Sequence, residues 1–130
     1  MSWQDYVNKQ LLATGSLRDA LIMGMDGVIW ARSTGLQETK PEEVQNLLAS
    51  LSDGGATLED VGGIRVAGTR YLYLAGEPGV FLSCKRAAVG LYVRQTQRVA
   101  IVALYQDPAT LQQCEACVTS LCHYLGNKGF

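Results

Sequence analysis

Three stretches of the chain place apolar side chains every three to four residues, which is the period of an amphipathic helix. The first runs from Ser2 to Leu12, and Ser2 and Asp5 have the spacing of a capping box, so a helix should begin there. A second capping box, with a proline in the first turn, stands at Thr39-Lys40-Pro41-Glu42, and a third pairs Thr110 with Gln113. The expected apolar stripes are Trp3, Tyr6, Val7, Gln10 and Leu11; Val44, Leu47, Leu48 and Leu51; and Cys114, Cys117, Val118, Leu121 and Leu125.

Short apolar runs between turn residues predict strands in the rest of the chain. Residues 19–23 and 28–32 flank Asp26-Gly27, a pair typical of a tight hairpin turn, and strict alternation puts Trp30 on the same side as Val28 and Arg32. Further strands are expected over residues 63–66, 69–74, 80–84, 90–95 and 98–105. The connections between them are too short for crossovers, so the strands should form an antiparallel meander. The sequence therefore predicts an α+β domain over residues 1–130 with a helix-covered sheet, in which Gln112, Glu115, Ala116 and Thr119 of the last helix face away from the core.

The charge of the chain is nearly balanced. Eleven basic side chains stand against 12 acidic ones, for a formal net charge of −1, so no basic face indicates a nucleic-acid partner. No apolar run approaches the length of a membrane span, and the first residues lack the layout of a signal peptide. These features favour a cytoplasmic protein.

The four cysteines are expected to be reduced and to pack as small apolar residues in that compartment. Cys114 and Cys117 form a C-x-x-C pair, which raises the alternative of a redox or zinc site completed by Cys122 and His123. At about 100° per residue, His123 lies roughly opposite Cys114 on a helix, so the four side chains should not converge on one ion. No metal and no cofactor are expected.

The sequence contains no set of residues typical of an enzyme. His123 is the single histidine, no Ser or Cys lies in a nucleophile-elbow context, and no phosphate-binding or dinucleotide fingerprint follows a strand. Five of the ten aromatic residues instead lie on three elements that can be neighbours: Trp3, Tyr6, Trp30, Tyr124 and Phe130. They can belong to the core, or they can line a half-exposed groove that accepts a polyproline II peptide.

The sequence at this point resembles the profilin family over essentially its whole length. The resemblance rests on the order and spacing of six motifs: Ser2-Trp3-Gln4-Asp5-Tyr6-Val7, Trp30 after Asp26-Gly27, Pro41-Glu42-Glu43-Val44, Gly76-Glu77-Pro78-Gly79, Tyr105-Gln106-Asp107-Pro108, and Tyr124-Leu125 with Phe130. The Gly-Glu-Pro-Gly turn is most similar to plant-like or protist members. The resemblance implies a central antiparallel sheet of six or seven strands, covered by the N- and C-terminal helices on one face and by shorter helices on the other.

The resemblance also implies an actin-monomer-binding adaptor that regulates actin polymerisation, associates with the cytoskeleton and binds proline-rich segments of partners such as formins. By position, the polyproline groove falls on Trp3, Tyr6, Trp30, Tyr124, Leu125 and Phe130. The actin-binding face falls on Arg70, Leu72, Lys85, Thr110, Gln112 and Glu115. Phe130 stands where many relatives have Tyr, Ser83 stands where relatives often have Arg, and the Lys85–Val89 loop has fewer glycines than usual.

Binding of phosphoinositide headgroups is a further property that the resemblance implies, here through the scattered basic residues Arg70, Lys85, Arg86, Arg94 and Arg98. A roadblock- or longin-like scaffold for small GTPases is an alternative, because such domains share a hairpin with a helix-covered sheet. That alternative gives no reason for aromatic residues near both ends of the chain. A scaffold of this type should dimerise, whereas a profilin should be a monomer.

Overall fold

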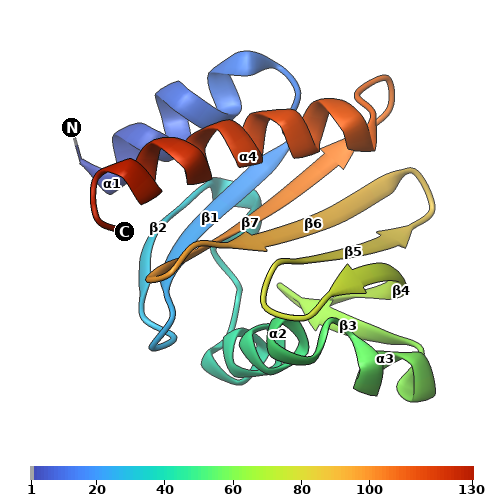
Figure 1. Ribbon diagram of the computed structural model, residues 1–130. Coiled ribbons are helices and arrows are strands. Elements are labelled where there is room, and N and C mark those ends of the chain that lie inside the picture. Colours follow the sequence, from blue (N-terminus) through green and yellow to red (C-terminus); the bar gives the residue numbers. More distant parts are fainter. Residues whose placement is uncertain (1) are drawn as a thin grey trace.

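A single seven-stranded antiparallel sheet forms the centre of the computed structural model, which describes residues 2–130 (Figure 1). The strand order across the sheet is β2-β1-β7-β6-β5-β4-β3. Strands β3 to β7 lie side by side in sequence order, and β7 pairs with β1 of the first hairpin. The strands are β1 Asp19–Gly24, β2 Ile29–Arg32, β3 Gly63–Val66, β4 Thr69–Glu77, β5 Phe81–Arg86, β6 Val89–Gln95 and β7 Val99–Gln106. The predicted antiparallel sheet and its hairpins are confirmed.

Helices cover both faces of this sheet. The N-terminal helical segment and α4 lie side by side on one face, and α2 and α3 lie on the other (Figure 1). The helical segments are α1 Trp3–Asp5, the π-helical turn η1 Tyr6–Leu11, the 3₁₀ turns η2 Leu12–Thr14 and η3 Thr34–Leu36, α2 Pro41–Asp53, α3 Ala56–Val61 and α4 Leu111–Asn127. The short helix α3 was not predicted. Within residues 2–130, no helix is both long and apolar enough to cross a membrane.

Two of the three predicted capping boxes are present. The Ser2 hydroxyl accepts a hydrogen bond from the Asp5 backbone N–H at 3.1 Å, and the Asp5 carboxylate accepts one from the Ser2 N–H at 3.3 Å. Thr110 and Gln113 form the same reciprocal pair at the start of α4, at 3.2 and 3.0 Å. Local sequence is sufficient to place these helix starts, because both partners lie within one turn.

The third predicted capping box, at Thr39, is wrong. Helix α2 begins one residue later, with Lys40 as its N-cap, because the Thr39 hydroxyl donates to the Leu36 carbonyl at 2.8 Å instead. A capping box has two hydrogen bonds, and the Lys40 side chain cannot accept its half because it has no acceptor atom. The other half is present: the Glu43 carboxylate accepts a hydrogen bond from the Lys40 backbone N–H at 2.8 Å. Gly54, with a positive φ of 67°, ends the helix where the sequence predicted.

The N-terminal helix is not α-helical throughout. After one turn, residues 6–11 adopt the wider π-helical turn, which rotates later side chains around the axis relative to an α-helix. Val7 and Leu11 are fully buried, whereas Gln10 is exposed, so the predicted membership of Gln10 in the apolar stripe is wrong. Thr119 on α4 is also misplaced by the sequence pattern, because its hydroxyl oxygen is buried rather than solvent-facing.

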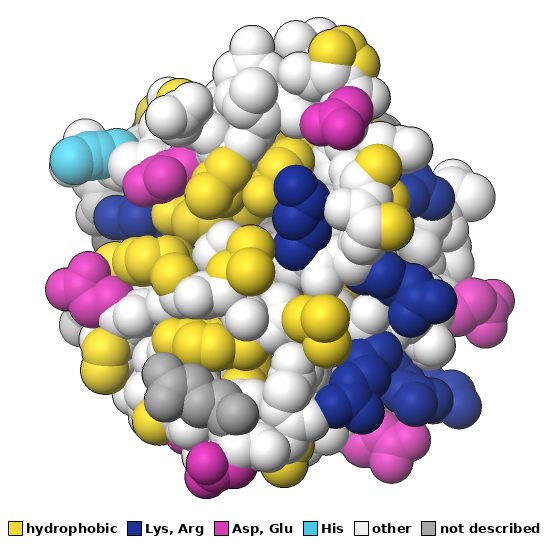
Figure 2. Space-filling view, turned by 90° about the vertical axis from the view of Figure 1, so that its right-hand side faces the viewer, with side chains coloured by type: hydrophobic (Ala, Val, Ile, Leu, Met, Phe, Trp, Pro, Cys, Tyr) yellow, Lys and Arg dark blue, Asp and Glu magenta, His cyan; other side chains and the backbone are white. Residues whose placement is uncertain are grey.

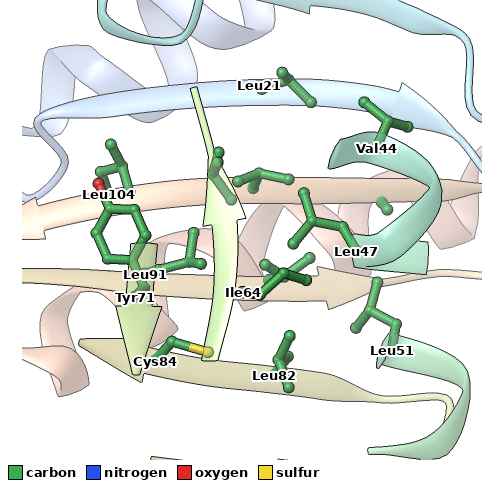
Figure 3. Packing of buried hydrophobic residues seen from close by; sticks show 14 of the residues in the cluster. Leu21, Val44, Leu47, Leu51, Ile64, Tyr71, Leu82, Cys84, Leu91 and Leu104 are labelled. Atoms are coloured by element: carbon green, nitrogen blue, oxygen red, sulfur yellow. The ribbon is translucent and has the colours of Figure 1, made fainter. Parts of the chain in front are cut away.

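Two separate apolar clusters fill the spaces on either side of the sheet. On one face, α2 packs Val44, Leu47 and Leu51 onto the sheet, and Tyr71 lies at the other end of the same cluster (Figure 3). On the other face, the N-terminal helix and α4 enclose a cluster that includes Val7, Leu11, Ile101, Val118 and Leu125. Cys122 belongs to this second cluster as well, although the helical pattern did not include it. The terminal helices are therefore held against one face by a continuous core.

Strand β2 contains a β-bulge at Trp30. The register of the β1–β2 hairpin shifts by one residue there, and Trp30 and its neighbour Ala31 both pack against the cluster beneath the terminal helices. The alternation that grouped Trp30 with Arg32 is wrong for this reason, since an extra residue in one strand redirects the side chains that follow. The bulge turns the Trp30 ring toward the N-terminal helix.

Candidate binding surfaces

Five aromatic side chains meet where the two terminal helices cross β2. The Trp3 ring centroid lies 4.7 Å from that of Trp30, 5.0 Å from Phe130 and 5.4 Å from Tyr6. Tyr6 in turn lies 6.2 Å from Tyr124. Four of the rings are half-buried and Tyr124 is 46% exposed, so the cluster presents ring surface to solvent. We call these five residues the aromatic strip.

Hydrogen bonds between α1 and β2, and between Phe130 and the segment before β7, hold the strip in place. The Gln4 side chain donates to the Arg32 carbonyl at 3.1 Å and ties the first helical turn to β2. Phe130 is fixed through its backbone: its carbonyl accepts hydrogen bonds from the Thr96 hydroxyl and the Arg98 N–H, both at 2.7 Å. These contacts restrict the rings before any ligand arrives, which lowers the entropy lost on binding.

Leu125, the sixth residue assigned to this groove from the resemblance, does not reach the surface. It is 1% exposed and belongs to the core beneath the strip. Its contribution is therefore to support the rings rather than to touch a ligand. At the strip itself, partial burial and the neighbouring Tyr124 hydroxyl raise the pKa of Tyr6 further from neutral pH. A tyrosine phenol is protonated at neutral pH even without that rise, so Tyr6 can donate a hydrogen bond.

A cavity adjoins each end of the aromatic strip. One, of about 260 Å³, lies between the terminal helices and is lined by Tyr6, Gln10, Cys117, Ser120, Leu121 and Tyr124. The other, of about 430 Å³, is more open and is lined by Trp30, Phe130, Gly24, Met25, Asp26, Gln97 and Arg98. Sequence reasoning missed Ser120, which lines the first cavity, and Thr96, which holds the Phe130 carbonyl, because only the packing of distant elements brings them to this surface. Gln10 was placed on the helix face of Tyr6, but as part of an apolar stripe and not as a cavity residue.

The second predicted surface lies on the strands and on the outer side of α4. All six of its residues are exposed: Arg70, Leu72, Lys85, Thr110, Gln112 and Glu115. Leu72 on β4 and Lys85 on β5 are direct cross-strand partners, and Leu72 and Leu74 are each 56% exposed. Figure 2 looks at the side of the β5–β6 turn and shows hydrophobic side chains lying beside a group of Lys and Arg side chains. We call the surface formed by these six residues and Leu74 the strand face.

Ser83 lies beneath the strand face rather than on it. The residue is 2% exposed, and its hydroxyl has no hydrogen-bond partner among the described residues. A serine here cannot extend to solvent as an arginine would. The strand face therefore lacks a cation at this position.

The basic residues considered for headgroup binding do not form one patch. Arg86, Arg94 and Arg98 line three different cavities, and only Arg86 approaches Arg70, whose carbonyl lies 3.5 Å from its guanidinium. Tyr92 accepts a hydrogen bond from Arg94 at 2.8 Å, which holds that side chain against β6.

The four cysteines are all free thiols. Burial raises the pKa of Cys84 and of Cys114 to about 12, and that of Cys122 to about 11. Cys117 is half-buried and lies within 3.9 Å of the Gln10 and Leu11 carbonyls. In the part of the chain that the structure describes, no group of three or more His, Cys, Asp or Glu side chains is arranged to hold a metal ion.

Comparison with known proteins agrees with this architecture. A family model described as Profilin matches residues 1–130. The profilin of Bombyx mori is 38% identical over 130 residues, which is 100% of both chains. The solved structure of Acanthamoeba castellanii profilin IA superposes with a TM-score of 0.87 at 28% identity, covering 99% of this chain and all of that one. Mouse profilin IIa, solved in complex with a double repeat from the FH1 domain of mDia1, superposes with a TM-score of 0.81 at 18% identity over the full length of both chains.

Proposed function

The chain belongs to the profilin family, and from that premise we propose that it is an adaptor that binds monomeric actin and proline-rich segments of partner proteins. Family membership also sets aside the roadblock- or longin-like alternative. The proposal assigns proline-rich ligands to the aromatic strip and actin to the strand face. The convergence of Trp3, Tyr6, Trp30, Tyr124 and Phe130 on one half-exposed surface is the observation that carries it.

The chemistry of the strip suits a polyproline II ligand. Prolyl rings stack on flat aromatic faces, and a proline-rich chain is already extended, so it loses little conformational entropy on binding. The indole N–H and phenol O–H groups can donate to the exposed carbonyls of such a chain. A cluster that served only the core would bury these rings completely, which the strip does not do.

The dimensions of the strip suggest the length of the ligand. The ring-to-ring steps from Tyr124 through Tyr6 and Trp3 to Trp30 are 6.2, 5.4 and 4.7 Å, so the strip is at most about 16 Å long. A polyproline II helix rises about 3.1 Å per residue, so about five residues span it. Mouse profilin IIa, which shares the fold, was solved with a double repeat from the FH1 domain of mDia1, and formins are accordingly the partners that we propose first.

Actin binding is proposed for the strand face, which shares only α4 with the strip: Gln112 and Glu115 lie in its first turns and Tyr124 in its last. Exposed Leu72 beside Lys85 offers apolar area next to a cation, and Gln112 and Glu115 extend the surface along α4. Two separate surfaces allow actin and a proline-rich segment to be held together. A monomer of this kind, acting in the cytoplasm and with the cytoskeleton, would deliver actin to a polymerisation factor.

Intrinsic fluorescence during titration with an oligoproline peptide tests the assignment of the strip. Trp3 and Trp30 are the two tryptophans of the chain and both belong to the strip. We expect a saturable change with oligoproline and none with a Gly/Ser peptide of equal length. If calorimetry detects oligoproline binding but the fluorescence stays constant, the ligand binds elsewhere and the assignment is wrong. If neither method detects binding, the proposed proline-rich partners are wrong.

A further inference from the structure

Strand β3 forms one edge of the sheet, and within residues 2–130 it pairs with β4 alone. The Tyr73 N–H donates a hydrogen bond to the Gly62 carbonyl at 3.2 Å, which fixes the alternation of bonded and non-bonded residue pairs between the two strands. The backbone N–H and C=O groups of Gly63 and Arg65 therefore point away from β4. An extended chain laid along this edge would find unpaired donors and acceptors there.

Helix α2 forms the opposite wall of a groove along this edge. A cavity of about 320 Å³ lies where β3 meets α2 and α3, the corner of the molecule at which Figure 1 labels all three elements. Its lining includes Ala49 and Asp53 of α2, Leu58 of α3, and Ile64 and Arg65 of β3. Domains that bind peptides by strand addition obtain affinity from main-chain hydrogen bonds and specificity from pockets for alternate side chains. The edge and the cavity together offer both.

Asp53 brings negative charge to the cavity. Its carboxylate accepts hydrogen bonds from the Gly55 N–H at 2.8 Å and from the Thr57 hydroxyl at 2.7 Å. These neutral donors orient the carboxylate without cancelling its charge, and Asp53 forms no ion pair with another side chain that the structure describes. Ala49 and Leu58 place apolar surface beside it. A lysine side chain fits both features, because its aliphatic stem packs on apolar surface while its ammonium group reaches a carboxylate.

Arg65 brings the opposite charge to the other side of the edge. Ile64 packs in the same cluster as Leu47 of α2 (Figure 3), and successive residues of a strand point to opposite faces, so the exposed Arg65 side chain lies on the face away from α2. Arg70 is its direct partner on β4, and like charges in that position repel. Among the described side chains, Arg65 has no acidic partner at ion-pair distance. An acidic residue opposite Arg65 on an added strand would share its face and offset the repulsion.

We propose that the groove between β3 and α2 binds an extended peptide segment of a partner protein in which an acidic residue and a lysine are neighbours in sequence. The acidic residue lies opposite Arg65, and the lysine, one position along, lies opposite Ile64 and extends into the cavity toward Asp53. The outward-facing backbone groups of Gly63 and Arg65 then form about four hydrogen bonds with the segment. The groove shares no residue with the aromatic strip or the strand face, so this inference does not rest on the proposed adaptor function.

Two other occupants fit the groove less well. Antiparallel pairing of β3 with β3 of a second copy would place both Arg65 side chains on one face, where they repel, and would turn Ile64 rather than a cation toward the cavity. A proline tract has no backbone N–H groups, so it cannot donate to the carbonyls of the edge. The charges of the groove therefore favour a different chain with alternating acidic and basic side chains.

Backbone NMR titration of the full chain tests this proposal. The probe is a short peptide of alternating Thr and Val with Glu-Lys at its centre and with acetylated and amidated ends. We expect saturable shifts of the Ser50, Gly63 and Arg65 amides, and none of these shifts with an oligoproline of equal length. The same peptide, N-methylated at the residues whose N–H groups face β3, should not bind. Equal binding of the N-methylated peptide would mean that no strand is added, and the absence of saturable shifts with the Glu-Lys peptide would overturn the proposal.

Charge variants test the two side-chain contacts. Asp53→Asn should lower the affinity for the Glu-Lys peptide about tenfold, as for loss of one charge-assisted contact. Asp60→Asn is the matched control, because Asp60 is exposed on α3 and does not line the cavity. Its affinity should stay within about twofold of the parent protein. Equal loss in both variants would reduce the effect to general electrostatics and overturn the proposal.

A charge exchange across the edge is the second test, and it changes a side chain that is exposed to solvent. Arg65→Glu should bind the Glu-Lys peptide about tenfold more weakly and should recover the affinity with a Lys-Lys peptide. Failure of the exchange would show that no residue lies opposite Arg65. Sedimentation velocity at the concentration of the titration checks the remaining occupant, since a dimer that shifts the Gly63 and Arg65 amides without peptide would assign the edge to a second copy and overturn the proposal.

Discussion

The ring of Trp3 lies 4.7 Å from the ring of Trp30, and this contact joins the first helical turn to the bulged strand β2. Trp3 also touches Tyr6 and Phe130, so it is the residue through which the aromatic strip is connected. Because central aromatic anchors dominate the binding energy of interfaces, the strip should be most sensitive to a change at this position.

Replacing Trp3 by alanine should weaken binding of a proline-rich peptide by about 2 kcal/mol or more, about thirtyfold in Kd. The measurement is calorimetric titration of the parent and variant proteins. Leu74→Ala serves as the control, because it removes an exposed hydrophobic side chain from β4, outside the strip. An unchanged affinity in a folded Trp3→Ala variant would remove the strip from the binding site.

Thr96→Val should weaken proline-peptide binding without removing any ring. The Thr96 hydroxyl donates to the Phe130 carbonyl at 2.7 Å, so its loss should let the Phe130 ring move away from Trp3. We expect a loss of about threefold to tenfold, the value of one hydrogen bond. Loss of peptide affinity together with greater mobility of the Phe130 ring by NMR supports this role. Weaker binding with an unaltered ring would contradict it.

Lys85→Glu should weaken actin binding and leave proline-peptide binding intact. Lys85 lies opposite Leu72 on the strand face and does not contact the aromatic strip. Lys40→Glu makes the same charge change at the start of α2, on the other face of the sheet, and should preserve both activities. Sedimentation of actin filaments in the presence of each variant reads out monomer sequestration. A parallel loss of both activities in Lys85→Glu would show that the surfaces are not independent.

Glu43→Gln should destabilise the fold. The Glu43 carboxylate is 4% exposed and accepts backbone N–H groups of Lys40, Ala67 and Gly68 at 2.8, 3.1 and 3.0 Å. An amide in its place directs an NH₂ group at one of these donors, so we expect a loss of about 1–3 kcal/mol in the free energy of unfolding. Urea denaturation measures it, with the exposed neighbour change Glu42→Gln as the control. Equal stability of the two variants would mean that the buried carboxylate contributes little.

The buried thiols should make the protein less stable at alkaline pH. An unperturbed thiol has a pKa of 9.0, whereas those of Cys84 and Cys114 are about 12 and that of Cys122 about 11 in the fold. The folded state thus keeps protons that the unfolded chain releases, so stability is complete below about pH 9 and falls as the pH rises from there. The urea midpoint should decline as the pH rises above about 9, and the part of the decline between about pH 9 and 10 precedes the ordinary titration of tyrosine. Cys114→Ala should show a shallower decline than the parent protein, and identical slopes would assign the pH dependence to other groups.

Local patterns were sufficient for much of the fold. The helix starts at Ser2 and Thr110, the Asp26-Gly27 hairpin and the stop at Gly54 each depend on residues within one turn of the chain, so their chemistry is readable in the sequence. The aromatic strip was predicted as a cluster because apolar periodicity placed its members on elements that could be neighbours. Contacts across the molecule could not be read in this way. Nothing near Lys40 in the chain indicates that Glu43 also binds the Ala67–Gly68 turn.

The sequence by itself determined which elements form and which aromatic residues are available to a ligand, because helix and strand periods and capping depend on short-range geometry. The tertiary structure alone decided how these residues are presented. A β-bulge turns Trp30 toward Trp3, the π-helical turn exposes Gln10, and packing beneath α4 buries Leu125. It also decided that Glu43 binds the Ala67–Gly68 turn, since segments distant in the chain become neighbours only when the strands of the sheet pair and its two cores are buried.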